Sequence, residues 1–137
     1  MAHILVIDDD IMICKLLRRA LERLGHQVTE APDGSKGLAA HKAAPAELII
    51  TDMLMPGMEG IETIQQFKRL SKATKIIAMS GGGMGKGIDY LNLARKFGAF
   101  HTLNKPFTIE RLNSVVADAL AGKPPSDVPP EDGQIAD

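Results

Sequence analysis

Several carboxylates stand where short apolar runs of this 137-residue chain end. Asp8, Asp9 and Asp10 follow one such run, and Asp52 follows another. Carboxylates gathered in one place repel one another and raise their own pKa values unless a cation is present. Oxygen donors suit Mg²⁺, a hard ion that prefers octahedral oxygen coordination and keeps waters that a phosphate can replace. These aspartates, if they converge, predict a magnesium site.

A hydroxyl and an amine follow two further apolar runs, at Ser80 and Lys105. A serine hydroxyl donates to phosphoryl oxygens, and a lysine supplies a compact positive charge. A carboxylate beside Mg²⁺ can itself act as the nucleophile and give an aspartyl phosphate, while cations neutralise the group in transit. Together with the aspartates, Ser80 and Lys105 therefore predict a site for a phosphoryl group. In isolation, each would be an ordinary strand-end or surface residue.

Five strand-like apolar runs alternate with helical patterns, which is typical of an α/β fold with a parallel sheet covered on both faces. In such sheets, ligands bind beyond the carboxyl ends of the strands, where the polar residues above fall. The predicted strands are His3–Ile7, Gln27–Ala31, Glu47–Thr51, Lys75–Met79 and Phe100–Leu103. The predicted helices run from about Met12 to Leu24, Ser35 to Ala43, Ile61 to Leu70, Ile88 to Phe97, and from a cap at Thr108 to about Ala121.

Apolar residues recur at three- and four-residue steps in the first and last helices, and we expect those of the last helix to face the sheet. They are Ile13, Leu16, Leu17, Ala20, Leu21 and Leu24 in the first helix, and Ile109, Leu112, Val115, Val116, Ala119 and Leu120 in the last.

The chain resembles the CheY-like receiver domains of response regulators in two-component signalling. The resemblance covers residues 3–121 through "ILVIDDD", "LIITDMLMPGMEGIE", "IIAMSG" and "NKPF", in the family's order and approximate spacing. It implies a doubly wound, flavodoxin-like (βα)5 fold, with a five-stranded parallel sheet in the order 2-1-3-4-5. It also implies a cis peptide bond between Lys105 and Pro106.

The resemblance assigns a role to each polar residue at the strand ends. Asp52 is implied to be the phosphoacceptor, with Ser80 and Lys105 contacting the phosphoryl group. The donor is implied to be a sensor histidine kinase or a histidine phosphotransfer protein, and the downstream protein target is unidentified. The expected chemistry is Mg²⁺-dependent self-phosphorylation and slow autodephosphorylation, not enzyme turnover. The implied ligands of Mg²⁺ are Asp8, Asp9, Asp52 and the backbone carbonyl of Leu54.

Some positions depart from the family's pattern. Thr102 stands where the family usually has a switch aromatic, which puts the usual relay in doubt, and Phe100 is only a partial substitute. Leu54 and Gly82, at positions that help to place the hydrolytic water, have no side chain able to hold one, so slow decay of the phosphoryl group is expected. The glycine-rich segment Gly81–Gly87 is hypothesised to fold over the phosphoryl group and to carry the switch.

Two other functions compete with this interpretation. The Asp8–Asp10 spacing fits a haloacid-dehalogenase-type phosphatase with Asp8 as nucleophile, but such enzymes need a late acidic pair where this chain has Ser80 and glycines. The segment Ser80–Gly87 approaches a phosphate-binding P-loop. It lacks the leading Gly and ends in Gly87, where a Ser or Thr would hold Mg²⁺.

Length and composition fit one ordinary globular domain, with 45% hydrophobic and 24% charged residues. The net charge of −1 argues against direct DNA binding or a coating of anionic lipid. The single cysteine, Cys14, falls in an apolar helical pattern and is expected to be a buried thiol. No apolar run approaches the ~18 residues of a membrane span, so we expect a cytoplasmic protein without membrane contact.

The C-terminal segment differs from the rest of the chain. Residues 122–137 contain two Pro-Pro pairs and one lysine against four acids, a balance of −3, whereas residues 1–121 have fifteen basic and thirteen acidic residues, a balance of +2. We expect a receiver at residues 1–121 and a disordered acidic tail at 122–137, too short for an output domain. A stand-alone signalling relay, either a monomer or a weak dimer, is the expectation.

Overall fold

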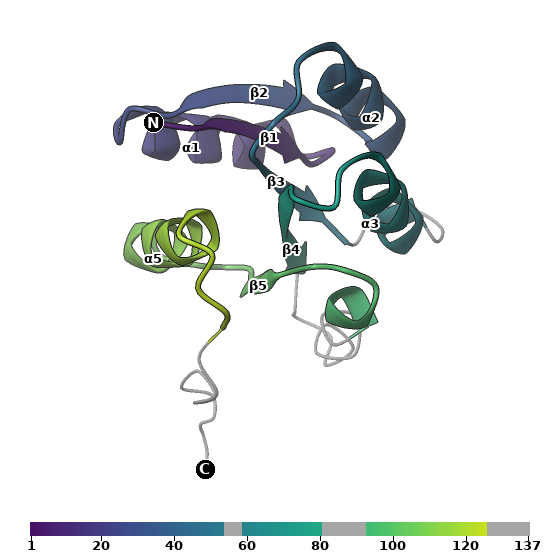
Figure 1. Cartoon of the computed structure of the whole chain (residues 1–137). Coiled ribbons are helices and arrows are strands. Elements are labelled where there is room, and N and C mark those ends of the chain that lie inside the picture. Colours follow the sequence, from purple (N-terminus) through teal and green to yellow (C-terminus); the bar gives the residue numbers. More distant parts are fainter. Residues whose placement is uncertain (54–58, 81–92, 126–137) are drawn as a thin grey trace.

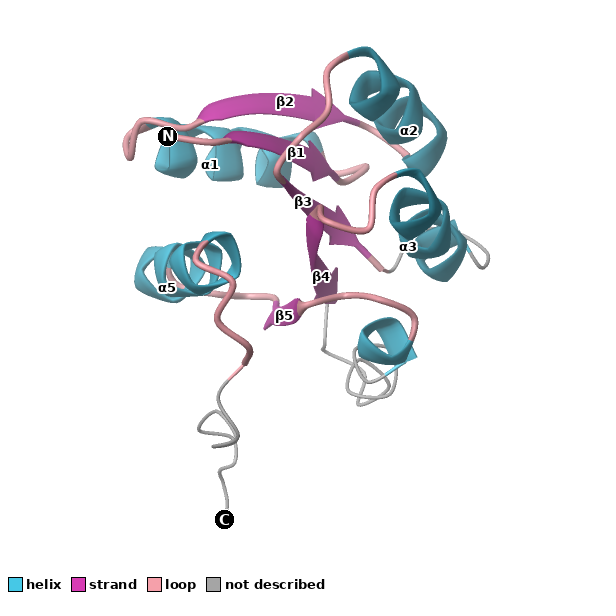
Figure 2. Cartoon of the chain, viewed as in Figure 1, coloured by secondary structure: helices cyan, strands magenta, loops and turns pink. Residues whose placement is uncertain are grey.

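The computed structural model describes residues 1–53, 59–80 and 93–125. Five strands form one parallel sheet in the order β2-β1-β3-β4-β5, and helices cover both of its faces (Figures 1 and 2). The predicted doubly wound fold and its strand order are therefore confirmed. Because every strand runs in the same direction, all five carboxyl ends lie at one edge of the sheet.

The predicted strands exist within one residue of their expected bounds, and the first, second, third and fifth helices within two. The strands are β1 (His3–Ile7), β2 (Gln27–Ala31), β3 (Leu48–Asp52), β4 (Lys75–Ser80) and β5 (His101–Asn104). The helices are α1 (Ile11–Glu22), α2 (Gly34–Ala43), α3 (Glu59–Leu70) and α5 (Ile109–Leu120). Of the fourth predicted helix, residues 93–96 are helical, and its first half lies outside the described residues.

Two apolar layers hold the sheet between the helices. Ile4 and Val6 of β1 belong to the layer that α1 and α5 complete, and Leu5 and Ile7 belong to the layer beneath α2 and α3. Figure 1 shows these helix pairs on opposite faces. Burial on both faces explains why the strands read as continuous apolar runs and not as alternating patterns.

Side-chain caps fix where helices begin. The Asp10 carboxylate accepts a hydrogen bond from the Met12 backbone N–H at 2.9 Å, and the Thr108 hydroxyl accepts one from Arg111 N–H at 3.0 Å. Such caps satisfy backbone donors that have no partner inside the helix. The cap predicted at Thr108 is confirmed, and the Lys105–Pro106 bond is cis, as the resemblance implies.

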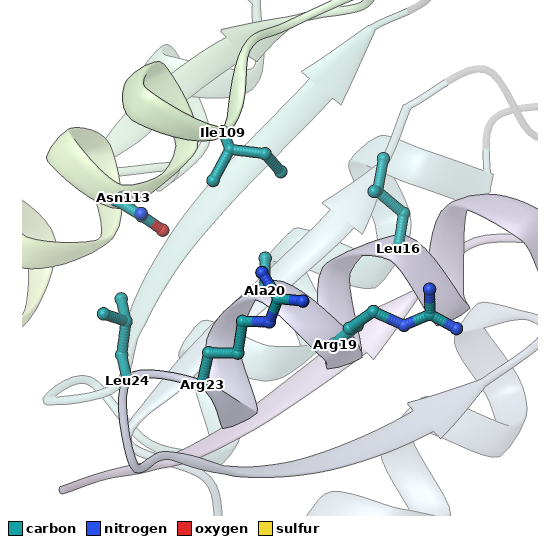
Figure 3. Close-up of a pocket in the computed structure, with 7 residues that line it drawn as sticks. All are labelled: Leu16, Arg19, Ala20, Arg23, Leu24, Ile109 and Asn113. Atoms are coloured by element: carbon teal, nitrogen blue, oxygen red, sulfur yellow. The ribbon is translucent and has the colours of Figure 1, made fainter.

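Part of the predicted core face is exposed instead. Leu16, Leu24 and Ile109 are 43%, 52% and 39% exposed. They line a groove between α1 and α5 with a volume of about 310 Å³, seen in Figure 3. The prediction that Ile109 faces the sheet is wrong, because this residue lines the groove beside α1. Leu16 lines the same groove, and Leu24 lies beyond the last residue of α1.

Among the residues described, no helix is both long and apolar enough to cross a bilayer. The predicted Gly81–Gly87 loop and residues 126–137 of the predicted tail lie outside the described residues.

Adjacent leucines of α1 provide a test of the packing. Leu17 is fully buried, whereas Leu16 is 43% exposed. Leu17→Ala is expected to lower the free energy of unfolding by about 2–5 kcal/mol, because it leaves a cavity in a close-packed layer. The matched control Leu16→Ala is expected to change it by only about 0.5 kcal/mol. Urea unfolding followed by circular dichroism measures both, and equal losses would contradict the packing described here.

Candidate functional site

The polar residues predicted from the strand ends meet at one edge of the sheet. Asp52 and Ser80 are the last residues of β3 and β4, and Asp8 and Lys105 directly follow β1 and β5. Sheet pairing extends one residue further than the sequence predicts at the ends of β3, β4 and β5, because Asp52 pairs with Met79 and Ser80 with Asn104. The pairing fixes the backbone of this edge.

Three carboxylates form the centre of the site. Single oxygen atoms of Asp8, Asp9 and Asp52 all lie within 4.8 Å of one another. Asp8 and Asp52 are 2% and 3% exposed, whereas Asp9 lies at the surface. The site is thus buried at its base and open on the side of Asp9. This is the convergence on which the predicted metal site depends.

Lys105 reaches into the carboxylate cluster. Its ammonium Nζ donates to Asp8 Oδ2 at 2.7 Å and lies 3.4 Å from Asp52 Oδ1. The side chain is 18% exposed, so the charge is largely withdrawn from water. Asp8 Oδ1 also accepts a hydrogen bond from the backbone N–H of Asp10 at 2.9 Å. Both oxygens of Asp8 are therefore engaged.

The charges of this cluster shift one another's ionisation. Burial raises the pKa of Asp8, and the neighbouring Asp52 charge adds to the rise, while the hydrogen bonds from Lys105 and from Asp10 N–H act in the opposite sense. Burial alone would lower the pKa of Lys105, but its hydrogen bond to Asp8 and the charge of Asp52 outweigh that effect, and the pKa is raised. The hydrogen bond from Lys105 therefore opposes the effect of burial on Asp8 and favours its ionised form.

Asp52 differs from Asp8 in its surroundings. Its Oδ1 is buried and makes no hydrogen bond within the described part of the chain, and its ion-pair partner there is Lys105 at 3.4 Å. A buried carboxylate oxygen without a hydrogen bond is costly, and a cation at the site would satisfy it. Three carboxylates against one lysine are an oxygen-only, electron-rich donor set. The residues present therefore fit Mg²⁺.

Two neighbours of the cluster have structural roles. The Asp10 side chain caps α1 and so is directed to the helix. The Cys14 thiol donates to the backbone carbonyl of Asp8 across 3.4 Å, and burial raises its pKa to about 11. Cys14 is confirmed as a buried thiol. Its contact with the Asp8 carbonyl was not predicted, because the sequence does not tell which strand end lies against α1.

The β4–β5 side of the site joins Ser80 to Lys105. Ser80 is fully buried, and its backbone carbonyl accepts a hydrogen bond from Lys105 N–H at 2.8 Å. Thr102 pairs with Ala78 on β4. Phe100 lies just before β5, its ring 4.7 Å from Lys75 Nζ and edge-on to His101. Phe100 thus packs where the strands begin, at the edge opposite the carboxylates.

Two residues of the predicted site lie outside the described residues. They are Leu54, whose backbone carbonyl is the expected fourth ligand, and Gly82, on which the slow-decay prediction partly rests.

Comparison with known proteins agrees with this arrangement. The profile of the family described as "Response regulator receiver domain" matches residues 4–117. A probable chemotaxis protein CheY from Rhizobium etli is 34% identical over 117 residues, covering 82% of this chain and 88% of that protein. The crystal structure of a response regulator receiver domain protein from Clostridium thermocellum superposes with a TM-score of 0.80 at 31% identity, covering 89% of this chain and 96% of that one.

Some relatives are much longer than this chain. The DNA-binding transcriptional regulator NtrC of Azospirillum brasilense is 37% identical over 134 residues, which cover 97% of this chain but 27% of NtrC. The chain therefore spans about a quarter of the length of NtrC and of the ZraR regulators that it also matches.

Removing the site's cation tests the electrostatics. Lys105→Met leaves the buried Asp8 carboxylate without its partner, so we expect a loss of about 3 kcal/mol in the free energy of unfolding at neutral pH. The loss should shrink as pH falls, because the pKa of Asp8 is already raised and a protonated Asp8 needs no cation. Urea titrations at several pH values measure it.

The matched control is Lys105→Met combined with Asp8→Asn, which removes both charges. This double variant should recover part of the lost stability and show a flatter dependence on pH. The single variant Asp8→Asn gives the effect of that substitution by itself. If the effects of the two single substitutions simply add in the double variant, the two side chains do not interact.

Proposed function

Since the chain belongs to the response regulator receiver family of two-component systems, we propose that it accepts a phosphoryl group on Asp52. The donor is a sensor histidine kinase or a histidine phosphotransfer protein, and the transfer depends on Mg²⁺. A bond forms between an Asp52 carboxylate oxygen and phosphorus, the bond from phosphorus to the donor breaks, and its electron pair leaves with the donor. The observation that carries the proposal is the buried, incompletely satisfied Asp52 carboxylate beside two other acids and a lysine.

Asp52 is better suited than Asp8 to act as the nucleophile. Both Asp8 oxygens accept hydrogen bonds, one from Lys105 Nζ at 2.7 Å and one from Asp10 N–H at 2.9 Å, which reduces their availability for attack. Asp52 Oδ1 makes no hydrogen bond within the described ranges. Lys105 Nζ, 3.4 Å from Asp52 Oδ1, is close enough to pair with oxygens of a phosphoryl group held there.

Asp8, Asp9 and Asp52 would hold Mg²⁺, together with the backbone carbonyl of Leu54 that the resemblance implies. When bound, Mg²⁺ supplies positive charge that offsets both the carboxylates and the phosphoryl oxygens. The Ser80 hydroxyl, at the end of the neighbouring strand, is the donor assigned to the phosphoryl group. Its burial and the Lys105 N–H to Ser80 carbonyl bond connect any movement of Ser80 to the end of β5.

The phosphatase alternative finds no support in the geometry. It needs a second aspartate two residues after the nucleophile to act as acid or base, but the Asp10 side chain caps α1 and accepts from Met12 N–H. Its nucleophile would be Asp8, whose oxygens are both hydrogen-bonded. The relatives matched by the chain include a probable chemotaxis protein CheY and the DNA-binding transcriptional regulator NtrC.

An exposed apolar surface lies at the entrance to the site. Ile11 and Met12, in the first turn of α1, are 66% and 76% exposed directly after the acidic run. Exposed apolar residues beside a reactive group are suited to docking a protein donor. The phosphoryl group is thus delivered by a protein that contacts α1. The signal then passes to a protein target through the conformational change of the receiver at residues 1–121, and we propose no role in this transfer for residues 122–137.

Phosphorylation is tested by incubating the chain with acetyl phosphate and Mg²⁺ and measuring intact mass. We expect the native chain to gain one phosphoryl group, and Asp52→Ala to gain none. Peptide mapping after borohydride reduction identifies the modified residue. The matched control Asp10→Asn, which alters an acid assigned to capping, should still gain the group.

Labelling of Asp52→Ala to the same extent as the native chain would contradict the assignment. Labelling of Asp8 would favour the phosphatase instead.

Metal binding is tested without phosphorylation, by thermal melts in rising concentrations of MgCl₂. Mg²⁺ at about 100 times its dissociation constant should stabilise the native chain by about 2.7 kcal/mol, because it binds the folded state alone. Asp9→Asn should need much more Mg²⁺ for the same shift. Asp33→Asn, which changes an acidic cap elsewhere at the start of α2, should melt like the native chain at each concentration. Equal shifts for all three proteins would exclude the carboxylate cluster as the metal site.

A further inference from the structure

A strongly basic surface lies away from the carboxylate cluster, where α3 and the helical turn at 93–96 end. It is hollowed, with a volume of about 550 Å³. Four of its cations are exposed, and Lys68 and Lys75 are half-buried. We call it the cationic surface. Lys68, Arg69, Lys72, Arg95 and Lys96 line the hollow, and we include Lys75 because its charge acts on Lys68.

These cations lie close together although two segments of the chain, residues 68–75 and 95–96, supply them. Lys68 Nζ donates to the backbone carbonyls of Lys72 and Thr74, at 2.9 and 3.2 Å. The Lys68 stem packs so closely on Gly98 that a Cβ there would lie 2.7 Å from Lys68 Cγ. Burial and the charge of Lys75 lower the pKa of Lys68. Like charges are thus held against one another at a cost that an anion would offset.

No acid neutralises this surface within the described residues. The ion pairs in the described part of the chain lie elsewhere: they join Arg18 to Glu22 and Glu30, and Lys105 to Asp8 and Asp52. Glu47 is the neighbouring acid, its backbone carbonyl bonded to Lys75 N–H, and its side chain makes no ion pair. Cations in the last turn of α3 do complement the helix dipole. That explanation covers Lys68 and Arg69 but leaves Lys72 and Lys75, which lie outside the helix.

The C-terminal segment leaves the described structure near the start of β5, at the edge of the sheet where Lys75 begins β4. The Lys123 carbonyl accepts from His101 Nε2 at 2.8 Å, the rings of His101 and Phe100 are 4.8 Å apart, and Lys75 Nζ lies 4.7 Å from the Phe100 ring centre. This chain of contacts connects the point where the segment begins to the cationic surface. The twelve residues from 126 to 137 span at most about 40 Å when extended, so every acid among them is within reach.

We propose that residues 126–137 dock on the cationic surface of the same molecule. The segment carries four acids and no basic residue: Asp127, Glu131, Asp132 and Asp137. Its charge is therefore opposite to that of the surface, and its attachment at Pro125 gives it a high effective concentration there. The α1 face fits less well, because Glu22 and Asp10 accompany its cations and Arg18 is already paired.

The test uses the full chain with a spin label on Gln134→Cys, which leaves Cys14 unlabelled because that thiol is 3% exposed and has a raised pKa. At low salt we expect loss of amide peak intensity at Lys72, Lys96 and Phe97. About 0.5 M NaCl should restore the intensity, because salt screens exposed charges. The Arg69→Gln, Lys72→Gln, Arg95→Gln triple variant should also restore it.

The matched control replaces three exposed cations of α1 by glutamine: Lys15, Arg19 and Arg23. In this variant the amide peaks of Lys72, Lys96 and Phe97 should lose intensity as they do in the native chain. Equal broadening of α1 amides, or broadening that survives the triple variant, would overturn the proposal. Broadening that grows with protein concentration would assign the segment to a second copy. If the spin label causes no loss of intensity and an oligonucleotide binds the cationic surface, the surface would be a nucleic-acid site instead.

Discussion

The ion pair between Lys105 and Asp8 is the interaction on which the site depends. Parallel topology brings three carboxylates to one partly buried edge, where burial and the neighbouring Asp52 charge oppose the ionisation of Asp8. Lys105 follows the edge strand β5, yet its side chain reaches Asp8 beyond β1, across the ends of β4 and β3. The long, flexible stem of lysine makes that reach possible. With one lysine against three carboxylates, the cluster has two more negative than positive charges, which favours a divalent metal ion at this site.

Strand order decides which groups become neighbours. β1 and β3 pair directly, so Asp8 and Asp52 lie at the ends of adjacent strands although more than forty residues separate them in the sequence. β4 lies between β3 and β5, which places Ser80 between Asp52 and Lys105 along this edge. Each group therefore occupies a fixed place relative to Asp52. The helices contribute by burying both faces, which holds these strand ends in register.

The same topology separates charge across the molecule. Carboxylates gather at the edge where strands end, and cations gather near the start of β4 and before β5. Helix α3 runs back toward the start of the strands, so the basic residues of its last turn join the opposite edge. A net charge of −1 averages these two regions and conceals both. Electrostatic arguments about partners therefore have to be made for each edge separately.

The sequence by itself determined the element order, the strand bounds to within a residue, and the residues at the strand ends, because apolar period and turn residues are local signals. It also indicated that Asp8, Asp52, Ser80 and Lys105 belong to one site, since parallel strands share a carboxyl edge. Only the tertiary structure decided that Lys105 pairs more closely with Asp8 than with Asp52, and that Leu16, Leu24 and Ile109 line a groove. It also decided that the cations of α3 and of the turn at 93–96 form one surface. Those outcomes depend on which segments become neighbours in space, and spacing along one segment does not carry that information.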